Sequence, residues 1–145
     1  MVGFVDVGRL PADSYGNIPP KSGGSVGTIR GTILYTNTTS FAIGVLPLGS
    51  VLVDFYVQVK TAFNDTGTDL LIVGYATDDD AIVDDLSGAS TGLTRAGAAG
   101  TVPVTELNGT PTTELKTLYA KYTGQNGNAS AGEAAFTLFY TREES

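Results

Sequence analysis

The stretch that decides the fold runs from Gly44 to Thr77 and reads GVLPLGSVLVDFYVQVKTAFNDTGTDLLIVGYAT. Between residues 51 and 59 its even positions are mixed and mostly polar, whereas its odd positions are bulky and apolar: Val51, Val53, Phe55, Val57 and Val59. A period of two is typical of a strand with one face in a core. Turn residues at 64–68 lead into a second apolar run at 70–73. Two such runs joined by turn residues predict a β-hairpin.

Short apolar runs separated by turn residues continue along the rest of the chain. Further strands are predicted over 28–36, 41–46, 70–76, 102–107 and 134–140. Residues 112–122 fit both helical spacing and alternation, and we favour a strand because it forms a hairpin with the run at 134–140. Residues 78–86 are predicted to be a loop or a single helical turn, and 88–100 a flexible segment.

Composition agrees with one all-β domain. The chain has 145 residues, 41% of them hydrophobic and 16% charged, which is enough to bury a core. Nineteen glycines, six prolines and abundant Thr favour strands and many turns. Seven or eight short strands with turn signals between them predict an antiparallel β-sandwich over residues 28–145.

Residues 1–27 differ from the rest and are predicted to form an extended N-terminal arm. Pro and Gly interrupt this segment, and it shows no sustained periodicity. A floppy terminus is the alternative interpretation. The arm nevertheless holds apolar residues that are unusual in a linker and are candidate contacts with a partner: Val2, Phe4, Val5, Val7 and Leu10.

The residue types that are missing limit the possible chemistry. The chain has no His, no Cys and no Trp. It therefore lacks the usual general base near neutral pH, a thiol nucleophile, and the usual ligands of structural zinc. We expect no enzyme activity and no cofactor, although a carboxylate-pair glycosidase remains conceivable.

Charge and hydropathy limit the possible partners and location. The net charge of −7 disfavours nucleic acid and anionic membrane surfaces. The sequence contains no run of about 18 apolar residues, and its N-terminus does not resemble a secretory signal. We therefore expect synthesis in a cytoplasm.

Two motifs resemble functional sites, and we expect neither to be functional. Gly88–Gly92 (GASTG) matches the G-x-S-x-G of a nucleophile elbow, but the chain has no His to accept the serine proton. Hard-cation ligands are dense at Asp65 with Asp69 and at 78–80. Calcium needs six to eight oxygen ligands, and the EF-hand pattern is incomplete. We expect both clusters to be turns whose carboxylates are solvated by water, with no bound metal.

Aromatic residues are concentrated near the C-terminus. They are compatible with a sugar-binding platform, but core and inter-subunit packing is favoured. The candidate oligomer-interface residues are Tyr119, Tyr122, Phe139 and Tyr140.

Several motifs together resemble a known family. The motifs are LPLGSV at 46–51, TAFNDTGTD at 61–69 with Val73-Gly74, the acidic loop after them, and YTG at 122–124 followed by AGEA at 131–134. Over about residues 28–142 the chain is similar to the small jelly-roll structural proteins of tailed-phage virions, and most similar to head decoration, or cement, proteins.

The resemblance implies a β-sandwich protomer that forms a homotrimer on the capsid surface and binds neighbouring subunits of the major capsid protein. It also implies an N-terminal arm that reaches over the shell, while the protein itself is made in the host cytoplasm. The alternative is a carbohydrate- or receptor-recognition module of a phage tail or fibre. The lack of Trp, the favoured sugar-stacking residue, weighs against that alternative.

Overall fold

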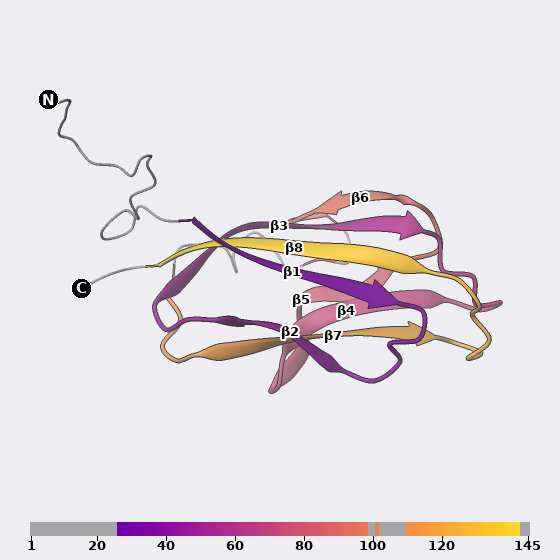
Figure 1. The fold of residues 1–145 in the computed structure, drawn as a ribbon, viewed down its shortest axis with the longest axis horizontal. Coiled ribbons are helices and arrows are strands. Elements are labelled where there is room, and N and C mark those ends of the chain that lie inside the picture. Colours follow the sequence, from indigo (N-terminus) through magenta and orange to yellow (C-terminus); the bar gives the residue numbers. More distant parts are fainter. Residues whose placement is uncertain (1–25, 99–100, 102–109, 143–145) are drawn as a thin grey trace, which may run out of the picture.

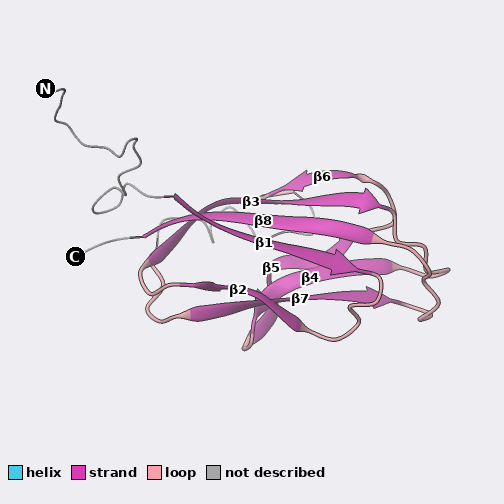
Figure 2. Ribbon diagram, viewed as in Figure 1, coloured by secondary structure: helices cyan, strands magenta, loops and turns pink. Residues whose placement is uncertain are grey.

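The computed structural model describes residues 26–98, 101 and 110–142. These residues contain eight strands and no helix (Figure 2). The strands are β1 (Val26–Leu34), β2 (Phe41–Leu46), β3 (Ser50–Thr61), β4 (Asp69–Tyr75), β5 (Asp78–Ser87), β6 (Gly92–Arg95), β7 (Lys116–Gly124) and β8 (Glu133–Arg142). The predicted all-β class is confirmed, as is the choice of a strand for the ambiguous segment that becomes β7. The predicted strand at 102–107 and most of the predicted arm lie outside the described residues.

The strands form two four-stranded antiparallel sheets that face each other (Figure 1). One sheet has the order β1-β8-β3-β6 and the other the order β2-β7-β4-β5. Consecutive strands lie in different sheets at every step except β4 to β5. Eight strands wound in this way between two sheets make a jelly-roll-like sandwich.

This winding contradicts the two predicted hairpins. The runs at 51–59 and 70–73 are not paired with each other, because β3 lies beside β8 and β6 whereas β4 lies beside β7 and β5. In the same way, β7 and β8 belong to different sheets. Turn residues show where a strand ends. They do not show whether the chain returns alongside that strand or crosses to the facing sheet.

Residues 78–86 were predicted to be a loop or helical turn, and this is wrong. They form β5, which pairs with β4 in a hairpin. The acidic composition is unfavourable for a strand. It is tolerated because a bulge between Val83 and Leu86 turns Asp84 and Asp85 to solvent, with Asp85 at φ 53°. The short strand β6 likewise lies within the segment predicted to be flexible.

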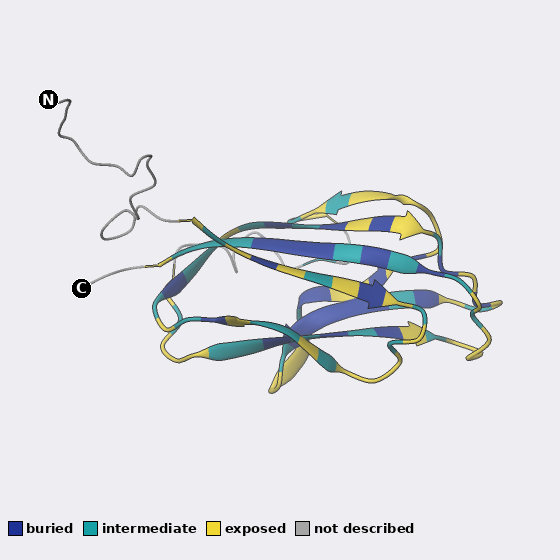
Figure 3. Ribbon diagram, viewed as in Figure 1, coloured by how far each residue is buried: buried dark blue, intermediate teal, exposed yellow. Residues whose placement is uncertain are grey.

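The core fills the space between the two sheets (Figure 3). Buried residues alternate along β7, whereas β4 is buried continuously from Leu71 to Gly74. Phe55 of β3 and Phe136 of β8 meet at its centre, with ring centroids 5.9 Å apart. The largest fully buried side chains are Tyr122, Phe55, Phe136, Ile33, Leu46, Leu71, Ile82, Leu118, Leu138, Val57, Val73 and Val83.

The predicted alternation in β3 holds only for its second half. Phe55, Val57 and Val59 are buried, but a bulge between Leu52 and Asp54 leaves Val53 half exposed. Before the bulge the even positions face the core, so Leu52 packs against it and Ser50 is buried. A single extra residue changes the face to which every earlier side chain points.

No helix in the described part of the chain is long and apolar enough to cross a membrane.

Candidate functional site

The loop after β3 and the loop after β7 are joined at one end of the sandwich by hydrogen bonds centred on Asp65. Its carboxylate accepts hydrogen bonds from the backbone amides of Gly67 at 2.7 Å, Asn126 at 3.0 Å and Asn128 at 3.0 Å. Only 7% of Asp65 is exposed. These contacts link residues that are about 60 positions apart in the sequence.

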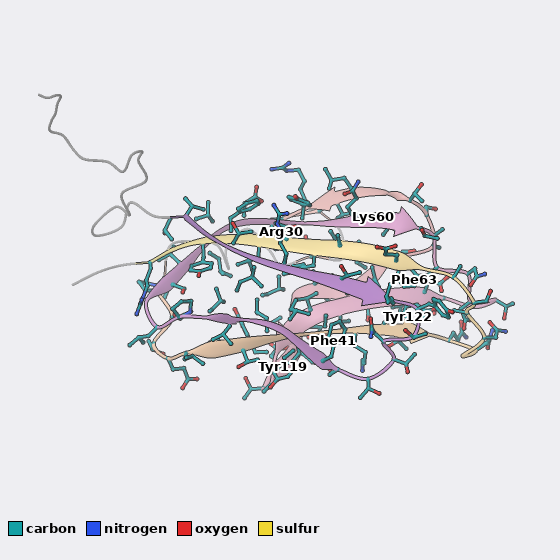
Figure 4. All side chains as sticks on the ribbon, viewed as in Figure 1. Arg30, Phe41, Lys60, Phe63, Tyr119 and Tyr122 are labelled. Carbon is teal, nitrogen blue, oxygen red and sulfur yellow. The ribbon has the colours of Figure 1, made fainter. Side chains whose placement is uncertain are left out.

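The carboxylate of Asp69 belongs to the same network as that of Asp65. Oδ1 of Asp69 accepts the backbone amide of Asp65 at 3.0 Å and the hydroxyl of Tyr122 at 2.6 Å. The Tyr122 ring stacks on Phe63 with 4.6 Å between ring centroids, and Figure 4 shows the two residues together at this end of the sandwich. Gly132, at φ 148°, lies so close to the Phe63 ring that a Cβ atom there would overlap it. The network and the ring stack together hold this end of the sandwich, which we call the locked end.

The expectation that water solvates these two carboxylates is wrong. Burial on its own would raise the pKa of Asp65, but the surrounding backbone amides of Gly67, Asn126, Asn128 and Gly127 outweigh it and hold the pKa below its ordinary value of 3.8. The oxygens of Asp65 and Asp69 are thus acceptors for the protein's own donors. Among the described residues, no group of three or more acidic side chains is placed to hold a metal ion.

The acidic β4–β5 hairpin has the opposite electrostatic character. The carboxyl of Asp80 shares a hydrogen bond with Asp78 and repels it, which raises the pKa of Asp78 above 3.8. Repulsion from Asp80 is also the main cause that raises the pKa of Asp84. These like charges are crowded and largely exposed, and none of them forms an ion pair with another described residue.

The G-x-S-x-G match does not have the strand–turn–helix context of a nucleophile elbow. Gly88–Gly92 connects β5 to β6, so a strand rather than a helix follows the motif. Its backbone is used structurally: the Gly88 carbonyl accepts the Phe63 amide at 2.9 Å, and the Gly88 amide donates to the Asp69 carbonyl at 2.9 Å.

The four candidate interface aromatics do not share one surface. Tyr119 and Phe139 are half-buried, and they lie on the outer faces of different sheets. Tyr140 packs against the core. Tyr122 is 1% exposed, so its side chain cannot present itself to a neighbour. The candidate arm contacts Val2, Phe4, Val5, Val7 and Leu10 lie outside the described residues.

A basic hollow of about 460 Å³ lies on the outer face of the β1-β8-β3-β6 sheet, and sequence reasoning missed it. Arg30 of β1 and Lys60 of β3 are both exposed there, and Figure 4 labels both. Ala135 and Thr137 of β8 lie between those two strands and form its floor. The other lining residues are Gly31, Thr32, Tyr56, Gln58 and Phe136.

The end of the sandwich opposite the locked end is apolar. It is formed where β1 begins, β2 runs into β3, β7 begins and β8 ends. Five of the seven exposed large hydrophobic residues of the described chain lie at or near it, and Leu115, at 63% exposed, is the most exposed of them. We call these five residues the apolar end: Val26, Val45, Leu48, Val53 and Leu115.

Comparison with solved structures finds the same fold in phage capsids. A chain in the cyanophage Pam1 capsid asymmetric unit is 19% identical, with a TM-score of 0.59 over 92% of this chain and 93% of that one. A chain in the acidic stable capsid structure of Helicobacter pylori bacteriophage KHP30 is 18% identical, with a TM-score of 0.57 over 82% and 89%. A chain in the capsid of Ralstonia phage GP4 is 17% identical, with a TM-score of 0.50 over 89% and 93%. No family model and no curated protein sequence matches this chain.

Proposed function

We propose that this protein is a structural component of a phage virion, and more specifically a decoration, or cement, protein that binds neighbouring major capsid protein subunits on the head. The observation that carries the proposal is the fold match to the Pam1 capsid chain, which extends over nearly the full length of both chains. A structural likeness at 19% sequence identity shows that the two chains share a fold, and nothing more. The function is therefore argued from the surfaces as well.

The apolar end supplies a surface suited to a protein partner. Exposed apolar residues are ordinary when scattered singly, but a group of them at one end of a domain is typical of an interaction site. The described chain enters β1 at Val26, which is itself part of this end. The arm that precedes Val26 therefore starts from the apolar end. We propose that the arm, through Val2, Phe4, Val5, Val7 and Leu10, and the apolar end contact the same shell surface.

A cement protein needs no reaction at its surface. Each contact made only with the assembled shell stabilises the shell by mass action. Repetition around a closed shell lets modest contacts add up. A rigid protomer suits this role, and the two-loop network around Asp65 makes one end of the sandwich rigid. We assign the protein no catalytic role.

Reconstruction of the parent particle by electron microscopy tests the proposal. We expect density for the sandwich at many positions over the head, with the apolar end toward the shell. Particles stripped of the protein should lose DNA at a lower temperature than decorated ones, and added protein should restore them. Density confined to the tail would refute the decoration role and favour a receptor-recognition module. Equal thermal stability with and without the protein would refute the cement role.

A further inference from the structure

The basic hollow differs in charge from the rest of the protein. The chain carries 15 acidic and 8 basic residues, for a net charge of −7. Arg30 and Lys60 nevertheless face the same hollow from β1 and β3. In the described part of the chain neither residue forms an ion pair, whereas the nearby Arg95 is paired with Asp54 at 2.8 Å. Glu133, which pairs with Thr61 in the strand register, does not line the hollow.

The hollow also has a shape and a floor that suit a docking site. Thr137 at its floor is only 4% exposed, and the Tyr56 ring at its wall is held against Phe139 with 6.2 Å between centroids. Exposed ion pairs alone contribute little to binding, because water and salt screen them. A hollow whose floor and walls exclude part of that water strengthens the attraction of two cations for a carboxylate.

The complementary element is on the same chain but on the other sheet. Five of the 15 acidic residues lie in the eight positions from Asp78 to Asp85. The tip of their hairpin extends beyond the rest of the sandwich at the lower edge of Figure 1. Mutual repulsion among these carboxylates would be relieved by a cation from outside. The hairpin belongs to the β2-β7-β4-β5 sheet and the hollow to the outer face of the facing sheet, so one protomer cannot join the two.

We propose that the acidic β4–β5 hairpin of one copy docks in the basic hollow of a second copy, with Arg30 and Lys60 binding its carboxylates. A contact between two different surfaces of identical chains closes into a ring where the rotation allows it. The inference rests on the proposed virion role, for which the family resemblance implies a homotrimer, and it names the surfaces that would form such an oligomer. Its test uses the isolated protein, so its outcome is separate from that of the decoration role.

The first experiment measures self-association of the full-length protein by sedimentation at low and high salt. We expect the wild type to associate and the association to weaken with salt. Arg30→Glu should raise the dissociation constant about tenfold or more, because like charges then face each other, and R30E/K60E should raise it further. Arg142→Glu is the matched control, since it makes the same change of charge at the opposite end of the sheet, and it should associate like the wild type. A monomeric wild type, or equal effects of R30E and R142E, would overturn the proposal.

Exchange of the charges provides the second experiment. Asp79→Lys with Asp84→Lys should weaken association as R30E/K60E does, because both aspartates are exposed on the hairpin. Combining the four substitutions should restore association, since an acidic hollow then receives a basic hairpin. This recovery also shows that the variants fold. Failure of the combined variant to recover would exclude the hairpin as the occupant and leave an acidic segment of the shell as the partner to test. A protein that self-associates through these charges but decorates no head would refute the virion role alone.

Discussion

The Tyr122 hydroxyl donates a hydrogen bond of 2.6 Å to Oδ1 of Asp69, from β7 to the first residue of β4, inside the locked end of the sandwich. Burial of the phenol and its bond to the Asp69 carboxylate both raise the pKa of Tyr122 far above its ordinary value. The hydroxyl therefore stays protonated and keeps donating at any pH at which the protein is handled. Asp69 in turn holds the Asp65 amide, so one hydroxyl supports both loops of the network.

Tyr122→Phe should lower the free energy of unfolding by about 1 to 3 kcal/mol. The ring and its stack on Phe63 are retained, so the loss is that of a buried hydrogen bond to a charged group. Urea unfolding measures this change. Tyr119→Phe is the matched control, because Tyr119 is half-buried on the outer face of β7, and it should change stability by less than about 0.5 kcal/mol. Equal losses in the two variants would contradict the role given to the Tyr122 hydroxyl.

Asp65→Asn should remove part of the dependence of stability on acid pH. Because folding lowers the pKa of Asp65 below 3.8, the carboxylate stabilises the folded protein above that pH, and this contribution disappears as the pH falls through the lower folded value. Melting curves should therefore show the wild type well above D65N at neutral pH, with the two converging below pH 3.8. A gap of constant size across this range would show that Asp65 acts through packing and not through its charge.

Asp80→Asn should stabilise the protein at neutral pH. A hydrogen bond with Asp80, together with repulsion from it, raises the pKa of Asp78, and repulsion from Asp80 raises the pKa of Asp84. The folded state therefore binds these protons more tightly and is destabilised once the pH rises through the raised values. At neutral pH the melting temperature of D80N should exceed that of the wild type, by less than the decrease that Tyr122→Phe causes. Under strongly acid conditions the two melting temperatures should be equal. Asp79→Asn removes the same charge, and it should have a smaller effect because Asp79 contributes least to the shift at Asp78.

Deletion of residues 2–20 should separate binding from folding. Burying an apolar side chain contributes about 1.5 to 3 kcal/mol, against about 1 to 2 kcal/mol per residue for ordering the backbone. The arm is therefore expected to bind productively only where a partner supplies the other half of the contact. We predict an almost unchanged melting temperature and at least a tenfold loss of particle binding. A truncated protein that decorates heads like the full-length protein would assign binding to the sandwich alone.

Most strand positions could be predicted from the sequence, because alternation depends only on local burial. Pairing could not. β3 ends at Thr61, and the turn-rich segment at 64–68 then carries the chain to the other sheet. The strand that pairs with β3 is β8, about 80 positions further on. Val53 shows a second limit, since a bulge is a property of two paired strands and leaves no mark in either sequence alone.

The candidate surfaces were harder to predict than the fold. Arg30 and Lys60 sit at even positions of two alternating strands, which places each of them on an outer face. Only the insertion of β8 between β1 and β3 puts both on one hollow. Asp65 looked solvated for the same reason: its amide donors at Gly67, Asn126 and Asn128 come partly from a loop about 60 residues away.

The register of β1 against β8 places Val26 directly opposite Thr141, and neighbouring Cα atoms in such a pair are about 5 Å apart. The first and last strands of the sandwich therefore begin and end almost in contact. A short peptide linker could join them, and the chain could be reopened in the exposed turn between β1 and β2, at residues 38–40. Such a circular permutant would keep every strand pair of both sheets. It would also move the free N-terminus to the locked end. An arm fused to that new N-terminus would then start from the opposite end of the molecule.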